Sequence, residues 1–180
     1  LRSWRGQLRF GESIFDVEQL VVPINHRSAK HWTGLIVYMQ EKRIQHYDGY
    51  RGSGEAHLKN MLRFLGEAHE ELKRADATFA NKHPGPFEYL SWKLVPTLQD
   101  FPKQEDNYNC GVIFATAAYT AGAGLTEMSF DAGTEKMNQQ RHKFLLMMMR
   151  KTADLKLADE EVAQRYKDLE KVFREGEVNK

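Results

Sequence analysis

The sequence predicts one α+β domain, because most of its predicted strands come early in the chain and its predicted helices follow later. Short apolar runs rich in β-branched residues indicate the strands, and apolar residues recurring at steps of three and four indicate the helices. A length of 180 residues is enough for one domain with a substantial core and short for two.

Four strands are predicted. The first, residues 18–24, is predicted to be buried, because the run is short, β-branched and stopped by a proline. The next two, 32–39 and 44–47, flank a polar tetrad and therefore predict a β-hairpin. The fourth is predicted at 89–95, after a stretch containing proline and glycine that predicts a loop over 74–88.

Three helices are predicted. Leucines and a methionine at helical spacing after Glu55 predict a helix of about four turns. Residues 98–109 are polar and lack an apolar period, so they predict a long loop. The small apolar residues that follow, from Cys110 to Gly122, suit a buried helix, and 134–150 predicts another.

Residues 151–180 differ in composition from the rest, because charged side chains dominate there. We therefore expect a domain over 1–150 and a charged amphipathic helical tail over 151–180. Because the chain begins with leucine rather than methionine, we also expect the domain to be N-terminally incomplete. The apolar strip of the tail consists of Leu155, Val162, Tyr166, Leu169 and Phe173.

The composition argues against several classes of protein. The formal net charge is +1, so the chain lacks the basic footprint of a nucleic-acid binder. No apolar run approaches the ~20 residues that a membrane span needs. One cysteine allows neither an internal disulfide nor a cysteine-rich zinc site, which suits a reducing compartment. We expect no nucleic-acid partner, no membrane association, no metal and no cofactor.

That cysteine, Cys110, lies where a polar loop meets a predicted helix. A thiol becomes a nucleophile when its pKa is lowered, and the N-terminus of a helix is one place where this happens. Gly111 leaves room for a substrate to approach. The alternative is that Cys110 is a small buried hydrophobic residue, the usual state of a free cysteine.

A cysteine nucleophile also needs a base and a group that orients the base. His31 opens the first strand of the predicted hairpin and Asp48 closes the second, so both should lie at one edge of the sheet. That edge can face the helix of Cys110. His46 is an alternative base within the second strand. The alternative for each residue, considered separately, is that His31 is an ordinary surface histidine and that Asp48 is an acid that starts a turn.

Several short motifs, in chain order, resemble the signature of the ubiquitin-like-protein-specific cysteine proteases, the SUMO or sentrin protease family. The resemblance covers roughly residues 13–150. The matching pieces are Pro23-Ile24-Asn25, His31-Trp32, Tyr47-Asp48, Gln104 and Asn107-Tyr108-Asn109-Cys110-Gly111-Val112. The chain differs from the family pattern at Asn109, where the family usually has aspartate, and at Gly49-Tyr50, where it often has Ser-Leu.

The resemblance implies a papain-like fold with a central mixed or antiparallel sheet and the nucleophile at a helix N-terminus. It implies that Cys110 attacks the carbonyl of a Gly-Gly terminus while His31 moves the proton. Asp48 would orient His31, and Gln104 would contribute to the oxyanion hole. Trp32 would cover the scissile bond and admit only glycine.

The implied partner is a ubiquitin-like modifier, with SUMO favoured, and its conjugates. The reaction is then processing of a precursor or removal of the modifier from lysine. The alternative function is a non-catalytic modifier-binding domain that retains the protease fold. We expect a nuclear or cytoplasmic protein, with the nuclear location implied by the resemblance alone.

Overall fold

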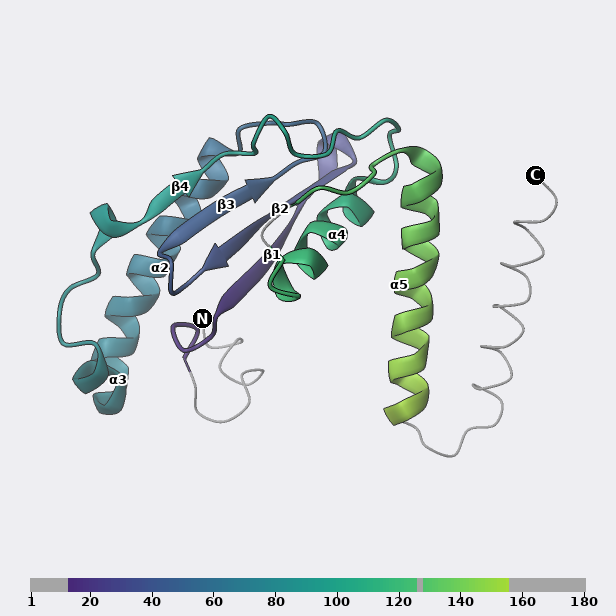
Figure 1. Ribbon diagram of the computed structural model, residues 1–180. Coiled ribbons are helices and arrows are strands. Elements are labelled where there is room, and N and C mark those ends of the chain that lie inside the picture. The colour runs from purple at the N-terminus through teal and green to yellow at the C-terminus, as the bar shows by residue number, and fades with distance from the viewer. Residues whose placement is uncertain (1–12, 126–127, 156–180) are drawn as a thin grey trace.

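The computed structural model describes residues 13–125 and 128–155 (Figure 1). A four-stranded mixed sheet in the order β1-β2-β3-β4 forms its centre. The elements are, in chain order, β1 (Gln19–His26), η1 (Arg27–Ala29), β2 (His31–Tyr38), β3 (Arg43–Tyr47), α2 (Glu55–Ala75), α3 (Ala77–Lys82), η2 (Tyr89–Ser91), β4 (Lys93–Val95), α4 (Cys110–Gly122) and α5 (Thr134–Leu155).

The sheet confirms the predicted hairpin. Strand β2 pairs antiparallel with β3, in a register that runs from Gly34 opposite Tyr47 to Tyr38 opposite Arg43. Strand β1 pairs antiparallel with β2, and β4 pairs parallel with β3. Because β2 begins where β3 ends, the first residue of β2 and the residues after β3 meet at one edge of the sheet.

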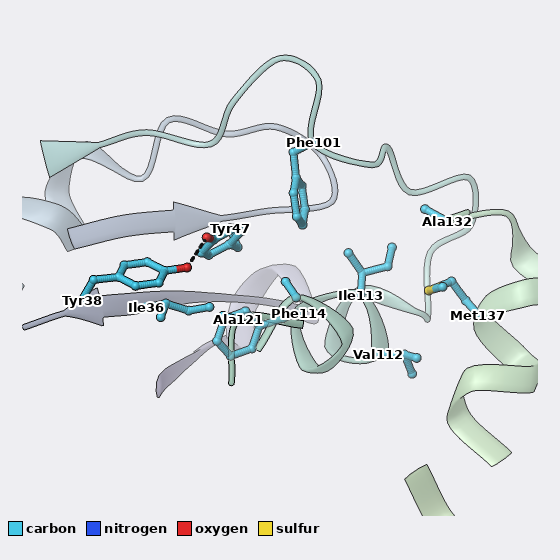
Figure 2. Packing of buried hydrophobic residues seen from close by; sticks show 11 residues of the cluster. Ile36, Tyr38, Tyr47, Phe101, Val112, Ile113, Phe114, Ala121, Ala132 and Met137 are labelled. Atoms are coloured by element: carbon cyan, nitrogen blue, oxygen red, sulfur yellow. Dashed lines mark hydrogen bonds between the residues drawn. The ribbon is translucent and has the colours of Figure 1, made fainter. Parts of the chain in front are cut away.

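Alternation along β2 and β3 gives the sheet two apolar faces. On one face, Ile36 and Tyr47 pack against α4, and the hydroxyls of Tyr38 and Tyr47 are hydrogen-bonded at 2.9 Å (Figure 2). On the other face, Leu35 and Ile44 pack against α2. Helices α2 and α4 therefore cover opposite faces of the sheet.

Helix α4 is buried on nearly all sides, as its uniformly small and apolar sequence predicts. Ile113 and Phe114 face the sheet core, and Phe144 of α5 packs against the same cluster. The helix ends at Gly122, as predicted. Helix α5 begins at 134 as predicted and continues to Leu155, five residues beyond the predicted end. From residue 156 on, the predicted tail lies outside the described residues.

Four of the predicted elements are wrong in part. Strand β1 is half-exposed rather than buried, and it continues through Pro23 to His26, because an edge strand tolerates a proline.

The loop predicted for 74–88 contains helix α3, whose N-cap is Asp76. Its carboxylate accepts hydrogen bonds from the backbone of Thr78 and Phe79, at 2.9 and 3.1 Å. The buried ring of Phe79 anchors this short helix against Phe15, with ring centroids 5.5 Å apart.

Helix α2 is also longer than the four turns predicted, because its apolar stripe continues through Leu65 to Ala68 on the side that faces the sheet. The strand predicted at 89–95 is reduced to Lys93–Val95, because Tyr89–Ser91 forms a 3₁₀ turn. The differences in α3, α2 and β4 lie at the end of the sheet away from the edge where β2 begins and β3 ends.

Gly34 determines how closely α4 approaches the sheet. A Cβ atom at this position would overlap the ring of Phe114, so α4 can lie directly on β2 only because the residue is glycine. At Gly85, by contrast, a Cβ would meet nothing within 4 Å. The two glycines provide a matched pair for substitution.

We expect Gly34→Ala to lower the free energy of unfolding by about 1–3 kcal/mol, because the added methyl group overpacks the interface between helix and sheet. Gly85→Ala should change it by less than about 0.5 kcal/mol. Urea denaturation of both variants provides the measurement. Equal stabilities of the two variants would show that the close approach at Gly34 does not constrain α4.

Candidate active site

The edge where β2 begins and β3 ends brings His31 and Asp48 together. His31 Nε2 lies 2.7 Å from Asp48 Oδ1, and both side chains are largely buried. The expectation that the hairpin places these residues side by side is therefore met. Because Asp48 takes Nε2, the ring nitrogen that remains for proton transfer is Nδ1.

Asp48 is held as a carboxylate by its surroundings. The backbone N–H groups of Tyr50 and Gly52 donate to its two oxygens, at 2.8 and 3.0 Å. Burial raises the pKa of Asp48, but the hydrogen bonds that the carboxylate accepts outweigh this effect and hold the pKa below its usual value. Asp48 therefore stays an anion, and His31 Nε2–H donates to it.

Cys110 is the first residue of α4, as predicted, and is 4% exposed. Its Sγ accepts a hydrogen bond from the backbone N–H of Trp32 at 3.3 Å. The sulfur therefore lies beside the residue that follows His31. Within the described residues, the sulfur makes no hydrogen bond to the His31 ring; such contacts are often loose without substrate and tighten when it binds.

Trp32 lies next to Cys110, at the start of β2. The residue is 41% exposed, and a Cβ on Gly111 would lie 3.8 Å from its ring. The indole thus stands beside the first turn of α4 with one side open to solvent. An aromatic wall here narrows the approach to Cys110.

Gln104 is buried in the loop before α4. Its backbone N–H donates to the carbonyl of Gly49 at 2.8 Å, which ties this loop to the turn after β3. Its side-chain Nε2 donates to the carbonyl of Asp106 at 2.8 Å and to Oδ1 of the same residue at 3.2 Å. Gln104 Oε1 is buried without a partner in the described part of the chain.

Asp106 organises this loop and was not singled out from the sequence. Its Oδ1 accepts the backbone N–H groups of Tyr108 and Asn109, at 3.0 and 2.8 Å. Burial raises the pKa of Asp106, but these hydrogen bonds outweigh burial and keep the pKa below its usual value. An aspartate shortly before a helix is a common signal of turns and caps, and that signal could have identified it.

Asn109, where the family pattern has aspartate, is fully buried between the loop and α5. Its Nδ2 donates to Asp106 Oδ2 at 2.7 Å, and its Oδ1 accepts from Arg141 at 2.7 Å. Arg141 also donates to the carbonyl of Tyr108 at 3.0 Å. Asn109, the residue before Cys110, thus forms hydrogen bonds with both Asp106 and Arg141 although its side chain is uncharged.

His46, the alternative base, does not face Cys110. It lies on the α2 side of β3, one residue before Tyr47, whose ring faces α4. Its Nδ1 contacts Thr97 Oγ1 at 2.9 Å and the carbonyl of Gly52 at 3.2 Å. Burial lowers its pKa, so this histidine is a buried polar residue of the other face.

Within residues 13–125 and 128–155, no cluster of three or more potential metal-ligating side chains is positioned to hold an ion. None of the helices described there is both long and apolar enough to cross a membrane.

The chain matches one known protein family over most of its length. The Ulp1 protease family, C-terminal catalytic domain, matches residues 2–158. The chain belongs to this family. Its α+β fold is therefore the papain-like protease fold that the sequence motifs implied.

Curated relatives of this Ulp1-family chain include two proteins of Arabidopsis thaliana. Ubiquitin-like-specific protease ESD4 is 28% identical over 129 residues, which cover 69% of this chain and 23% of the relative. Ubiquitin-like-specific protease 1A is 20% identical over 112 residues, covering 62% and 20%. The chain thus spans less than a quarter of the length of either relative.

Solved structures share the fold of this Ulp1-family domain. The C-terminal Ulp1 protease domain in complex with Smt3, the yeast orthologue of SUMO, has a TM-score of 0.56 at 21% identity, covering 78% of this chain and 55% of that one. SUMO protease Ulp1 with its catalytic cysteine oxidised to a sulfinic acid has a TM-score of 0.57 at 20% identity, covering 78% and 56%.

We expect Asp106→Ala to lower the free energy of unfolding by about 1–3 kcal/mol, because buried donors of the loop lose their acceptor. Glu105→Ala removes the neighbouring exposed carboxylate and should change it by less than about 0.5 kcal/mol. Urea denaturation compares the two variants. A loss of stability that is the same for both would contradict the organising role of Asp106.

The lowered pKa of Asp48 predicts a pH-dependent contribution to stability. This contribution is present above the unfolded-state pKa of about 3.9 and is lost as the pH falls through the lower folded-state value. The difference in unfolding free energy between wild type and Asp48→Asn should therefore be largest above about pH 5 and shrink toward pH 3. Denaturation at a series of pH values tests this, and a difference independent of pH would contradict it.

Proposed function

We propose that this domain is a thiol isopeptidase that cleaves after the Gly-Gly terminus of a ubiquitin-like modifier, with SUMO as the favoured modifier. The observation that carries the proposal is the 2.7 Å contact between His31 and Asp48 beside the Cys110 sulfur at the start of α4. Membership of the Ulp1 protease family supports it. The choice of SUMO is supported by the solved Ulp1 domain in complex with Smt3.

In the proposed reaction, His31 Nδ1 accepts the proton of the Cys110 thiol. The thiolate then attacks the carbonyl carbon of the terminal glycine, and a tetrahedral intermediate forms. His31 returns the proton to the leaving lysine amine, which leaves a thioester on Cys110. Water, deprotonated by His31, hydrolyses the thioester and releases the modifier. Asp48 stays ionised throughout and stabilises the protonated imidazole.

The oxyanion would be bound by two donors. The backbone N–H of Cys110 is available because the first N–H groups of a helix have no intrahelical partner. Gln104 supplies the second donor if its Nε2–H leaves the longer, 3.2 Å contact with Asp106 Oδ1 while keeping the 2.8 Å contact with the carbonyl. Trp32 would restrict the residues at the scissile bond to glycine, because larger side chains would meet its ring.

We place the reaction in the nucleus or the cytoplasm. A chain with one cysteine suits a reducing compartment, and the family resemblance favours the nucleus.

The protein should form a covalent adduct with a SUMO vinyl sulfone and none with the matched ubiquitin probe. Mass spectrometry of the intact and digested protein should locate the adduct on Cys110. Cys110→Ser should form no adduct and still bind SUMO, because the hydroxyl keeps the volume of the side chain and lacks a reactive thiolate. SUMO binding by the wild type without any adduct would favour a non-catalytic modifier-binding domain instead.

Gln104→Ala should lower kcat by about 10²–10³-fold with little change in KM, because the lost donor acts mainly on the oxyanion. Gln40→Ala, at an exposed position after β2, serves as the control and should leave kcat unchanged. Thermal unfolding of both variants separates a damaged loop from a missing donor. A kcat of Gln104→Ala equal to that of the wild type would show that Gln104 only supports the loop.

A further inference from the structure

Tyr50 contacts both members of the His31–Asp48 pair. Its ring stacks on the imidazole of His31, with centroids 4.8 Å apart and planes inclined by 25°. Its backbone N–H donates to Asp48 Oδ1, the same oxygen that contacts the imidazole. The residue follows Asp48 closely in the turn after β3, where the family pattern often has leucine.

The other end of Tyr50 reaches the loop before α4. Its hydroxyl donates to the carbonyl oxygen of Asp106 at 2.8 Å. The same carbonyl accepts the Nε2–H of Gln104, also at 2.8 Å. One side chain therefore joins the pair at the edge of the sheet to the proposed oxyanion donor.

Core packing does not account for this arrangement, because Tyr50 is 50% exposed. A half-exposed ring gains little from burial and, without specific contacts, would be free to change rotamer. Here both ends of the side chain are fixed, one by the aromatic stack and one by the hydroxyl. The contacts that fix it are made to the residues assigned to the reaction.

We propose that Tyr50 is a positioning residue that aligns the two halves of the active site. Its ring restricts rotation of the His31 imidazole, so that Nε2 stays on Asp48 and Nδ1 stays directed toward the nucleophile. Its hydroxyl fixes the Asp106 carbonyl and, through it, the amide of Gln104. The consequence for turnover rests on the proposed function, whereas the consequence for the His31 ring does not.

Two substitutions separate the two contacts. Tyr50→Phe keeps the ring and removes the hydroxyl, so kcat should fall by about 2- to 10-fold, with KM nearly unchanged. Tyr50→Leu also removes the stack, and the combined loss in kcat should be about 5- to 100-fold. Tyr89 offers matched controls, because it is 46% exposed and its ring centroid lies 4.8 Å from that of Phe87, away from the site. Tyr89→Phe and Tyr89→Leu should leave kcat unchanged.

A second measurement needs no modifier substrate. The rate at which iodoacetamide alkylates Cys110 is followed against pH, because this rate depends on the thiolate fraction of Cys110, which the nearby imidazole affects. Within the described residues, the imidazole contacts the titratable groups of Asp48, Tyr50 and His26, whose ring centroid lies 5.9 Å away. The Cys110 sulfur lies beside the adjacent Trp32 N–H. Asp48, His26 and Cys110 are kept in every variant. Tyr50→Leu should displace the pH profile of alkylation relative to wild type, whereas Tyr50→Phe should retain the wild-type profile.

The two measurements distinguish failure of this proposal from failure of the proposed function. If the wild type alkylates normally but does not cleave modifiers, the proposed function fails and the alkylation profile still tests Tyr50. The positioning role is overturned if Tyr50→Leu has the alkylation profile of the wild type. It is also overturned if the Tyr50 variants lose no more kcat than the Tyr89 variants.

Discussion

The direct packing of α4 on β2 is the constraint on which the site depends. Glycine at position 34 leaves space for the ring of Phe114, so the helix lies close to the strand. That approach brings Cys110 within 3.3 Å of the Trp32 backbone N–H, which belongs to the same strand. The position of Cys110 relative to His31 is thus set by the contact between strand β2 and helix α4.

The elements that form the site follow strong local patterns, which is why the sequence predicts them. A polar tetrad between two apolar runs specifies the hairpin, and with it the meeting of His31 and Asp48. Helix α3 was missed because one capping carboxylate, Asp76, and one buried ring decide it. Asp106 was missed because its importance comes from the donors that the folded loop directs at it, and spacing along the chain does not show them.

The loop before Cys110 carries its carboxylate at a position that differs from the family pattern. Where the family pattern has aspartate, this chain has Asn109, and the carboxylate lies three residues earlier, at Asp106. Arg141 still binds position 109 through the amide oxygen. Asp106 accepts the backbone N–H groups of Tyr108 and Asn109 through its carboxylate. Its carbonyl accepts hydrogen bonds from Gln104 and Tyr50. The uncharged residue at 109 is therefore held by hydrogen bonds with Asp106 and Arg141 at the start of α4.

The two contacts that form the site join residues at very different separations along the chain, and this difference affects the order of folding. His31 and Asp48 are separated by 17 residues, whereas Trp32 and Cys110 are separated by 78. Loop closure costs less entropy for the shorter separation, so the hairpin should pair its histidine and aspartate before α4 docks. Cys110 approaches His31 only in that late docking step. A newly synthesised or partly unfolded chain therefore has no thiol beside the histidine, which limits indiscriminate reaction of the cysteine before the fold is complete.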